Sequence, residues 1–188
     1  MRIISDYQFT DEQDRGATAA IGNFDGVHLG HLSVIDMARA AAPDAPLGIV
    51  TFEPHPRSYF APKSPPFRLM SSAARASRLA KVGVDRLYQL PFNTALAALT
   101  PFDFADKVLH QGLGLAHVVV GADFCFGQGR KGTADDLKTY GQRLGFGVTI
   151  APLMEQTEQT ISSTAIRRAL TDARPRDAAA MLGHWHRV

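Results

Sequence analysis

Residues 17–31, ATAAIGNFDGVHLGH, decide the fold of this chain. An apolar run at Ala17–Phe24 leads into a glycine turn, and from about Gly30 a helical period follows, with Ile35 and Ala38 on one face. A strand that passes through a glycine turn into a helix is the repeating unit of parallel α/β sheets. In such sheets the turn is also where phosphate groups bind. The stretch therefore predicts both a fold and a ligand-binding position.

The same alternation continues along the rest of the chain. Further strands are expected at four short apolar runs, Leu47–Phe52, Arg86–Leu90, His117–Gly121 and Val148–Ala151. Helices are expected after the capping residues Ser71, Thr100 and Thr133, after the hydroxyl run Ser162-Ser163-Thr164, and from Pro175 onward. We therefore predict the α/β class, with a parallel sheet covered by helices on both faces.

Two segments have the composition of loops. Five of the 11 prolines lie between Pro54 and Pro66. Because proline fixes φ and has no N–H to donate, we expect a surface loop there, neither helix nor central strand. The second segment, Asp123–Gly132, carries three glycines, two aromatic residues and two cations. That mixture is typical of a ligand-binding loop.

Length and composition limit the partners that we expect. A chain of 188 residues, 45% of them hydrophobic, predicts a single domain over residues 1–188 with a substantial core. The net charge of +2, with no clustered basic patch, predicts no nucleic-acid partner. One cysteine, Cys125, and no apolar run of about 20 residues predict a cytoplasmic protein without a membrane partner.

The first glycine turn places His28 and His31 at the start of a helix. The turn matches neither G-x-G-x-x-G nor the P-loop pattern, because no lysine follows the glycines. Imidazole N–H groups at such a position can stabilise charge on a phosphoryl group during its transfer. Two other interpretations stay open: a zinc pair, for which further ligands at motif spacing are missing, and two surface histidines without a role.

A second motif, ISSTAIRRAL at residues 161–170, begins another helix with three hydroxyl groups and a cation one turn later. Helix capping accounts for one of these hydroxyls. The others, together with Arg167, have the chemistry needed to hold the outer phosphates of a nucleotide. By itself this motif is weak, and its combination with the histidine turn makes it specific.

Four segments, in this order and spacing, resemble the FMN adenylyltransferase module of bacterial bifunctional FAD synthetases. They are GNFDGVHLGH (22–31), TFEPHPRSYF (51–60), VVVGADFCFGQGRKG (118–132) and ISSTAIRRAL (161–170). That family belongs to the nucleotidylyltransferases with the HxGH signature, and the resemblance extends over almost the whole chain. It implies a Rossmann-like, doubly wound α/β fold. It also implies the reaction of ATP with FMN to give FAD and pyrophosphate, with Mg²⁺ carried on the ATP phosphates.

The resemblance also implies roles for individual residues. His28 and His31 match the histidine pair that steadies the α-phosphate of ATP, and Arg167 completes the catalytic set. The nucleotide-binding residues would be Gly22, Asn23, Phe24, Asp25, Gly30, Ser163 and Thr164. Candidates for contact with the flavin are Phe52, Phe60, Asp123, Phe124 and Phe126, although core packing explains phenylalanines at least as often. No side chain is assigned to a metal.

Two features depart from the family pattern. Asp123 stands where some members carry asparagine, and it could approach magnesium or a flavin or ribose hydroxyl instead. No riboflavin kinase barrel follows Gly183, so phosphorylation of riboflavin is not predicted, and a shortened form and a single-activity enzyme both stay open. Two alternative functions also remain: a related nucleotidylyltransferase that acts on another phosphate ester, and a non-catalytic flavin or nucleotide sensor.

Overall fold

The computed structural model describes residues 1–152, 155–156 and 159–185. Its centre is a six-stranded sheet with the order β1-β4-β3-β2-β5-β8, and every neighbouring pair is parallel. The strands are β1 (Arg2–Ile4), β2 (Thr18–Ile21), β3 (Leu47–Glu53), β4 (Arg86–Pro91), β5 (His117–Gly121) and β8 (Gly147–Ala151). The prediction of a doubly wound α/β fold is confirmed.

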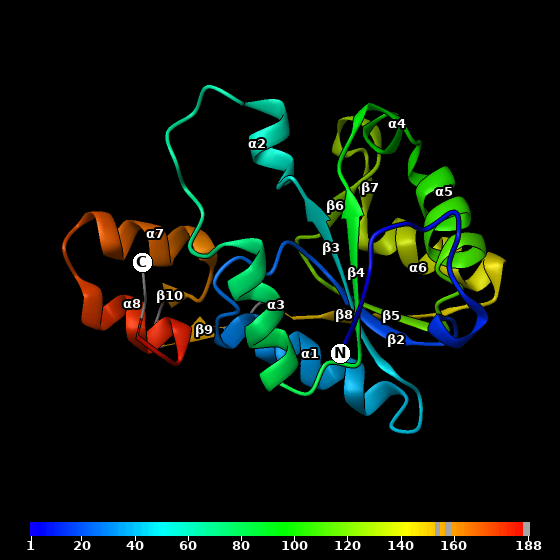
Figure 1. Cartoon of the computed structure of the whole chain (residues 1–188), viewed down its shortest axis with the longest axis horizontal. Helices are drawn as coiled ribbons and strands as arrows, with labels where there is room; N and C mark the ends of the chain where they lie inside the picture. The colour runs from blue at the N-terminus through cyan, green and yellow to red at the C-terminus, as the bar shows by residue number, and fades with distance from the viewer. Residues whose placement is uncertain (153–154, 157–158, 186–188) are drawn as a thin grey trace.

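Helices cover the sheet on both faces (Figure 1). One face packs against α1 (Leu29–Ala41) and α3 (Ser72–Lys81). The other packs against α6 (Ala134–Leu144) and a π-helical segment, η2 (Phe104–Gly112), which continues from the short helix α5 (Pro101–Asp103). Because both faces are covered, the central strands are buried on both sides: all four residues of β2 and six of the seven in β3 are buried.

The remaining elements lie around the ends of the strands. Two helices, α7 (Ser163–Thr171) and α8 (Pro175–Leu182), form a pair with a small core of its own. The short elements are η1 (Glu12–Asp14), α2 (Pro56–Phe60), α4 (Thr94–Ala97), η3 (Gln128–Arg130), the hairpin of β6 (Cys125–Phe126) with β7 (Gly132–Thr133), and the hairpin of β9 (Glu155–Gln156) with β10 (Gln159–Thr160). In the part of the chain that the structure describes, no helix is long and apolar enough to cross a membrane.

The predicted helix starts are confirmed by their caps. The hydroxyls of Ser71, Thr100 and Ser162 each accept a hydrogen bond from a backbone N–H in the first helical turn, at 3.2, 3.0 and 3.1 Å. Thr133 goes further and forms a reciprocal capping box with Asp136. Each cap satisfies donors that the helix itself leaves free, which is why these sequence signals were reliable.

Three local predictions need correction. The proline-rich segment does contain a helix, α2, because Pro56 occupies the first helical turn, where its missing N–H is not needed. Strand β1 was not predicted, since three residues are too few for a periodicity signal. The helix predicted after Thr100 has Phe102 on its apolar stripe, but Phe102 is half-buried and packs on Tyr140 at the surface, while Phe104 takes the core position.

The strand order determines where a ligand can bind. From β2 the chain moves through β3 and β4 in one direction and then returns to place β5 on the other side of β2. In doubly wound sheets, the crevice at the carboxyl ends of the strands beside such a reversal is the binding position. The glycine turn, 22–30, leaves β2 at this point.

Candidate active site

A cavity of about 1230 Å³ opens at the carboxyl ends of the strands. Five strands contribute a residue within two positions of their last one, namely Gly22, His55, Phe92, Asp123 and Pro152. The start of α7 also lines the cavity, with Ser163, Thr164 and Arg167. Every residue predicted from the sequence to belong to the site lines this cavity: Gly22, Asn23, Phe24, Asp25, His28, Gly30, His31, Phe52, Phe60, Asp123, Phe124, Phe126, Ser163, Thr164 and Arg167.

The two histidines of the turn are linked by the start of α1. His28 is the N-cap of this helix, and its Nδ1 accepts a hydrogen bond of 3.2 Å from the backbone N–H of His31. In the neutral ring, a nitrogen that accepts carries no proton, so the proton lies on Nε2. His28 therefore has Nε2–H as a hydrogen-bond donor, and the residue lines the cavity.

Both imidazoles are kept neutral. Burial lowers the pKa of His28 from 6.5 to about 4, against a smaller opposing effect of the Asp25 carboxylate. Burial also lowers the pKa of His31 well below its usual value, and the neighbouring His28 adds to this. The two rings are stacked, with centroids 3.6 Å apart and planes 18° apart. Their donors can therefore stabilise a phosphate without adding positive charge to the cavity.

Close approach explains the glycine at position 30. A Cβ on Gly30 would lie 3.2 Å from the His28 ring and 3.1 Å from the carbonyl oxygen of Ile161. In the same turn, the buried residues Phe24 and Val27 have positive φ angles of 49° and 42°. Positive φ is unfavourable for bulky residues and for β-branched ones above all, and such strain gathers at functional sites. The packing of these two buried side chains therefore holds the turn in an unfavourable backbone conformation.

Asp25 joins the histidine turn to α7. Its carboxylate accepts from the backbone N–H groups of Leu69 and Met70 and forms an ion pair of 2.6 Å with Arg167. Its backbone oxygen accepts a hydrogen bond of 2.8 Å from the Ser163 hydroxyl. The two motifs, far apart in sequence, therefore form one wall. The Asp25 side chain is buried and engaged by these partners, which fits a positioning residue.

Aromatic rings make up the end of the cavity beyond α2. Phe52, Tyr59 and Phe60 each pack on Phe92, with ring centroids 5.8, 5.3 and 5.7 Å away. Phe124 and Phe126 form a parallel pair at 5.4 Å. Phe52 and Phe126 belong to the core, while Phe60 is 67% exposed. One end of the cavity thus suits a planar ring system, and the histidine end suits phosphates.

Sequence reasoning missed part of the site. His55 is buried in the cavity wall, caps α2 by accepting from the N–H of Arg57, and has its pKa lowered to about 4, mainly by burial. Phe67 lies beside it at 5.0 Å and carries the guanidinium groups of Arg57 and Arg167 over its ring, at 4.5 and 5.2 Å. The missed signal was positional: His55 follows a fully buried strand, just as the glycine turn does.

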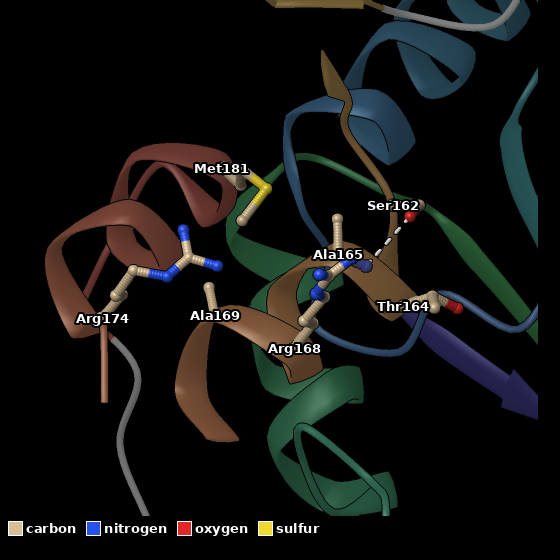
Figure 2. A pocket seen from close by; sticks show the side chains of 7 residues that line it. All are labelled: Ser162, Thr164, Ala165, Arg168, Ala169, Arg174 and Met181. Atoms are coloured by element: carbon tan, nitrogen blue, oxygen red, sulfur yellow. Dashed lines mark hydrogen bonds between the residues drawn. The ribbon is translucent and has the colours of Figure 1, made fainter. Parts of the chain in front are cut away.

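A second cavity, of about 480 Å³, lies on the other side of α7, between α7 and α8 (Figure 2). Ser162 and Thr164 line both cavities. Its most prominent cation, Arg174, is held by two carboxylates of its own helical pair, Asp172 and Asp177, at 3.1 and 2.8 Å. None of the histidines in the described part of the chain lines this cavity, whereas His28, His31 and His55 line the larger one.

Comparison with protein families agrees with this geometry. A model of the family described as FAD synthetase matches residues 10–165, which include the histidine turn, the aromatic loop and the start of α7. The chain belongs to the FAD synthetase family. The match ends before Arg167, whose contact with Asp25 comes from the structure alone.

Several curated FAD synthetase relatives are longer than this chain. A bifunctional riboflavin kinase/FMN adenylyltransferase of Pseudomonas fluorescens is 38% identical over all of this chain and 61% of its own length. The bifunctional enzyme of the same name from Escherichia coli K12 is 34% identical over 95% of this chain and 58% of its own length. The chain therefore spans about three fifths of these relatives. A FAD synthetase of Listeria monocytogenes is 32% identical, over 94% of this chain and 72% of its own length.

A solved structure shares the fold of this FAD synthetase family member. It is a crystal structure described as a macrolide-efflux protein from Streptococcus pneumoniae, with a TM-score of 0.81 and 30% identity. The similarity covers 97% of this chain and 61% of the other. The name of that protein refers to efflux, whereas the family model that matches this chain is described as FAD synthetase.

Proposed function

We propose that this chain transfers the adenylyl group of ATP to the phosphate of FMN, giving FAD and pyrophosphate. One observation carries the proposal. Asp25 joins the histidine turn to Arg167, so that donors and a cation suited to a triphosphate lie in the same cavity as a wall of aromatic rings. Family membership supports the same reaction.

The proposed step is a direct, in-line displacement. An oxygen of the FMN phosphate attacks the α-phosphorus of ATP, the new P–O bond forms, and the bond from the α-phosphorus to the pyrophosphate oxygen breaks. A phosphate dianion is already nucleophilic, so no general base is needed, and no covalent intermediate with the protein forms. Acceleration then comes from positioning and from charge stabilisation.

Each polar group of the cavity has a part in this scheme. The Nε2–H of His28 donates to the α-phosphate, where negative charge builds up, and His31 stacks beside it to fix the ring. Arg167 stabilises the departing pyrophosphate through the guanidinium nitrogen Nη1, which has no partner among the described residues. Asp25 and Ser163 act as positioning residues, because their side-chain contacts are made with the protein.

Magnesium would arrive on the phosphates of ATP. The described residues contain no group of three histidine, cysteine or acidic side chains that could hold a metal ion. Among the described residues, two carboxylates line the cavity: Asp25 is paired with Arg167, whereas Asp123 is exposed and has no ion pair with any of those residues. This donor set fits Mg²⁺, which is commonly held by one or two carboxylates plus substrate oxygens. Asp123 would then be the protein ligand, and the ion would neutralise phosphate charge.

The proposal covers adenylyl transfer by residues 1–188 as one domain, and it does not include phosphorylation of riboflavin. The direct test is incubation of the purified 188-residue chain with ATP, Mg²⁺ and FMN, with chromatography for FAD and an assay for pyrophosphate. Formation of both in equal amounts is the expected result. Binding of ATP and FMN without pyrophosphate release would favour a non-catalytic sensor.

A panel of acceptors separates the flavin enzyme from related nucleotidylyltransferases. FMN, phosphopantetheine and a polyol phosphate are offered with ATP or CTP under identical conditions. The aromatic wall, with Tyr59, Phe60 and Phe92 in mutual contact, favours a planar acceptor over these aliphatic ones. Faster turnover with an aliphatic phosphate ester than with FMN would overturn the assignment of the acceptor.

A further inference from the structure

The cavity poses an electrostatic problem at the point where its two ends meet. In the proposed reaction, the FMN phosphate must come against the α-phosphate of ATP, so two anions approach closely. Like charges at such a distance repel each other strongly where water is scarce. A cation at the junction of the aromatic end with the phosphate end would remove this repulsion. The following inference rests on the proposed function and identifies that cation.

Among the residues that the structure describes, three arginines and no lysine line the cavity: Arg57, Arg130 and Arg167. The charge of Arg167 is partly balanced by Asp25, 2.6 Å away. The cavity histidines add no charge, because burial keeps His28, His31 and His55 neutral. Among the described residues, Arg57 and Arg130 have no carboxylate within ion-pair distance. They are the two cations available for a second phosphate.

The neighbours of Arg57 place it at the junction. Its guanidinium lies 4.5 Å from the centre of the Phe67 ring, and that of Arg167 lies 5.2 Å from the same point. The two guanidiniums are therefore less than about 10 Å apart. A guanidinium stacked on an aromatic face keeps its N–H groups free at the edge, where they can bind an oxyanion.

Arg57 also shares its helix with the aromatic end. Tyr59 and Phe60 follow it within α2, and both pack on Phe92. The helix is fixed at its start by His55, whose Nδ1 accepts from the N–H of Arg57 at 3.0 Å, and farther along by Tyr59, whose hydroxyl lies 2.9 Å from that of Thr94. One short element thus presents rings toward the flavin end and a cation toward the phosphate end.

Arg130 has different surroundings. It belongs to η3, between the strands of the β6–β7 hairpin, and no aromatic ring or carboxylate of the described residues fixes its exposed side chain. Of the three cavity arginines, only Arg57 and Arg167 lie over the ring of Phe67. We infer that Arg57 holds the phosphate of the acceptor, so that this residue makes the site select a phosphorylated flavin over the same flavin without its phosphate.

The test compares two flavins that differ only in the phosphate. Binding of FMN and of riboflavin to the full 188-residue chain is measured by flavin fluorescence, without ATP. The unchanged chain should bind FMN more tightly than riboflavin. Arg57→Gln should weaken FMN binding about 10-fold, the effect of losing a hydrogen bond to a charged group, and leave riboflavin binding within twofold. Since Arg57 is exposed, the variant should fold normally, which circular dichroism checks.

Arg130→Gln is the matched control, because it removes the same charge from the same cavity. It should leave the preference for FMN intact. Loss of the preference in Arg130→Gln, its persistence in Arg57→Gln, or its absence from the unchanged chain would each overturn the inference. These results are independent of catalysis. Failure of the chain to form FAD while Arg57→Gln behaves as expected would contradict the proposed function and leave this assignment standing.

Discussion

The guanidinium of Arg167 lies 2.6 Å from the carboxylate of Asp25, although 142 residues separate them in the chain. Asp25 also accepts from backbone N–H groups, so its charge stabilises both Arg167 and the segment at Leu69. Asp25→Asn keeps the size of the side chain and removes the ion pair. We expect a loss of about 1–3 kcal/mol in the free energy of unfolding and a 10- to 100-fold slower adenylyl transfer.

Urea denaturation and FAD formation measure these two effects. Asp172→Asn is the matched control, since it removes an exposed carboxylate that pairs with Arg174 and should change stability by less than about 1 kcal/mol. Equal stability losses in the two variants would show that the buried pair contributes no more than a surface pair.

His28 combines two tasks that substitution can separate. Its Nδ1 caps α1, and its Nε2–H is the proposed donor to the α-phosphate. Asparagine is a good N-cap but lacks the imidazole, so His28→Asn should retain most of the stability, while His28→Ala loses about 1 kcal/mol. Both should slow transfer by about 10²- to 10³-fold with little change in the KM for ATP. Transfer near the original rate by a folded His28→Asn would contradict the donor role.

Gly30→Ala tests the close approach at the turn. Alanine is favoured over glycine by about 1 kcal/mol within a helix, but its Cβ would lie only 3.2 Å from the His28 ring. Helix propensity and crowding against the ring have opposite effects on stability, whereas of the two only the displacement of the ring affects catalysis. We expect nearly unchanged unfolding in urea and about 10-fold slower transfer. Ser33→Ala, one turn farther along α1, controls for helix propensity and should leave the rate unchanged.

The lowered pKa values of His28 and His55 predict an acid-labile fold. Each histidine takes up a proton near pH 6.5 in the unfolded chain but only near pH 4 in the folded one. Between these values the unfolded state binds more protons, so stability falls as the pH drops, by up to about 1.4 kcal/mol per unit for each histidine. Urea denaturation at pH 5.0 and 6.5 should show a smaller difference in His28→Asn and in His55→Asn than in the unchanged chain. An equal difference in all three would mean that neither histidine is buried in its neutral form.

Phe60 offers a clean probe of the flavin end, because its ring is 67% exposed yet lines the cavity. Phe60→Ala should raise the KM for FMN several-fold, from the loss of one aromatic contact, without changing the KM for ATP or the stability. Steady-state kinetics with each substrate varied in turn measures this split. Phe9→Ala removes a ring that is 82% exposed and lies outside the cavity, so it should change neither KM.

The sequence predicted what depends on local rules. The strand that ends at Ile21, the glycine turn, the capped start of α7 and the capping box of Thr133 all follow from interactions within a few residues. For the same reason the sequence placed His28 and His31 together at the start of α1. Helix α2 was not predicted, because the many prolines in this segment indicated a loop, although one of them, Pro56, occupies the first turn of the helix.

What remained hidden depends on contacts between distant segments. No spacing rule brings Arg167 to Asp25, or sets Arg57 and Arg167 on the ring of Phe67, since these residues meet only after the sheet has formed. His55 was hidden for a further reason: it lies in a segment that its prolines marked as a surface loop. His55 is buried just after the end of β3, where it lines the cavity, and the residues next to it in the sequence do not indicate this.

The common direction of the six strands has a practical consequence for engineering. All the residues discussed as ligand contacts gather where the strands finish, so the connections that lead into the strands lie at the far edge of the sheet. Two of these connections are the segment 42–46 before β3 and the bend at Gly145 before β8. A Cβ added to Gly145 would have no neighbouring heavy atom within 4 Å. Affinity tags, fluorophores or fused partners attached at these two connections would be remote from the proposed active site and leave it accessible.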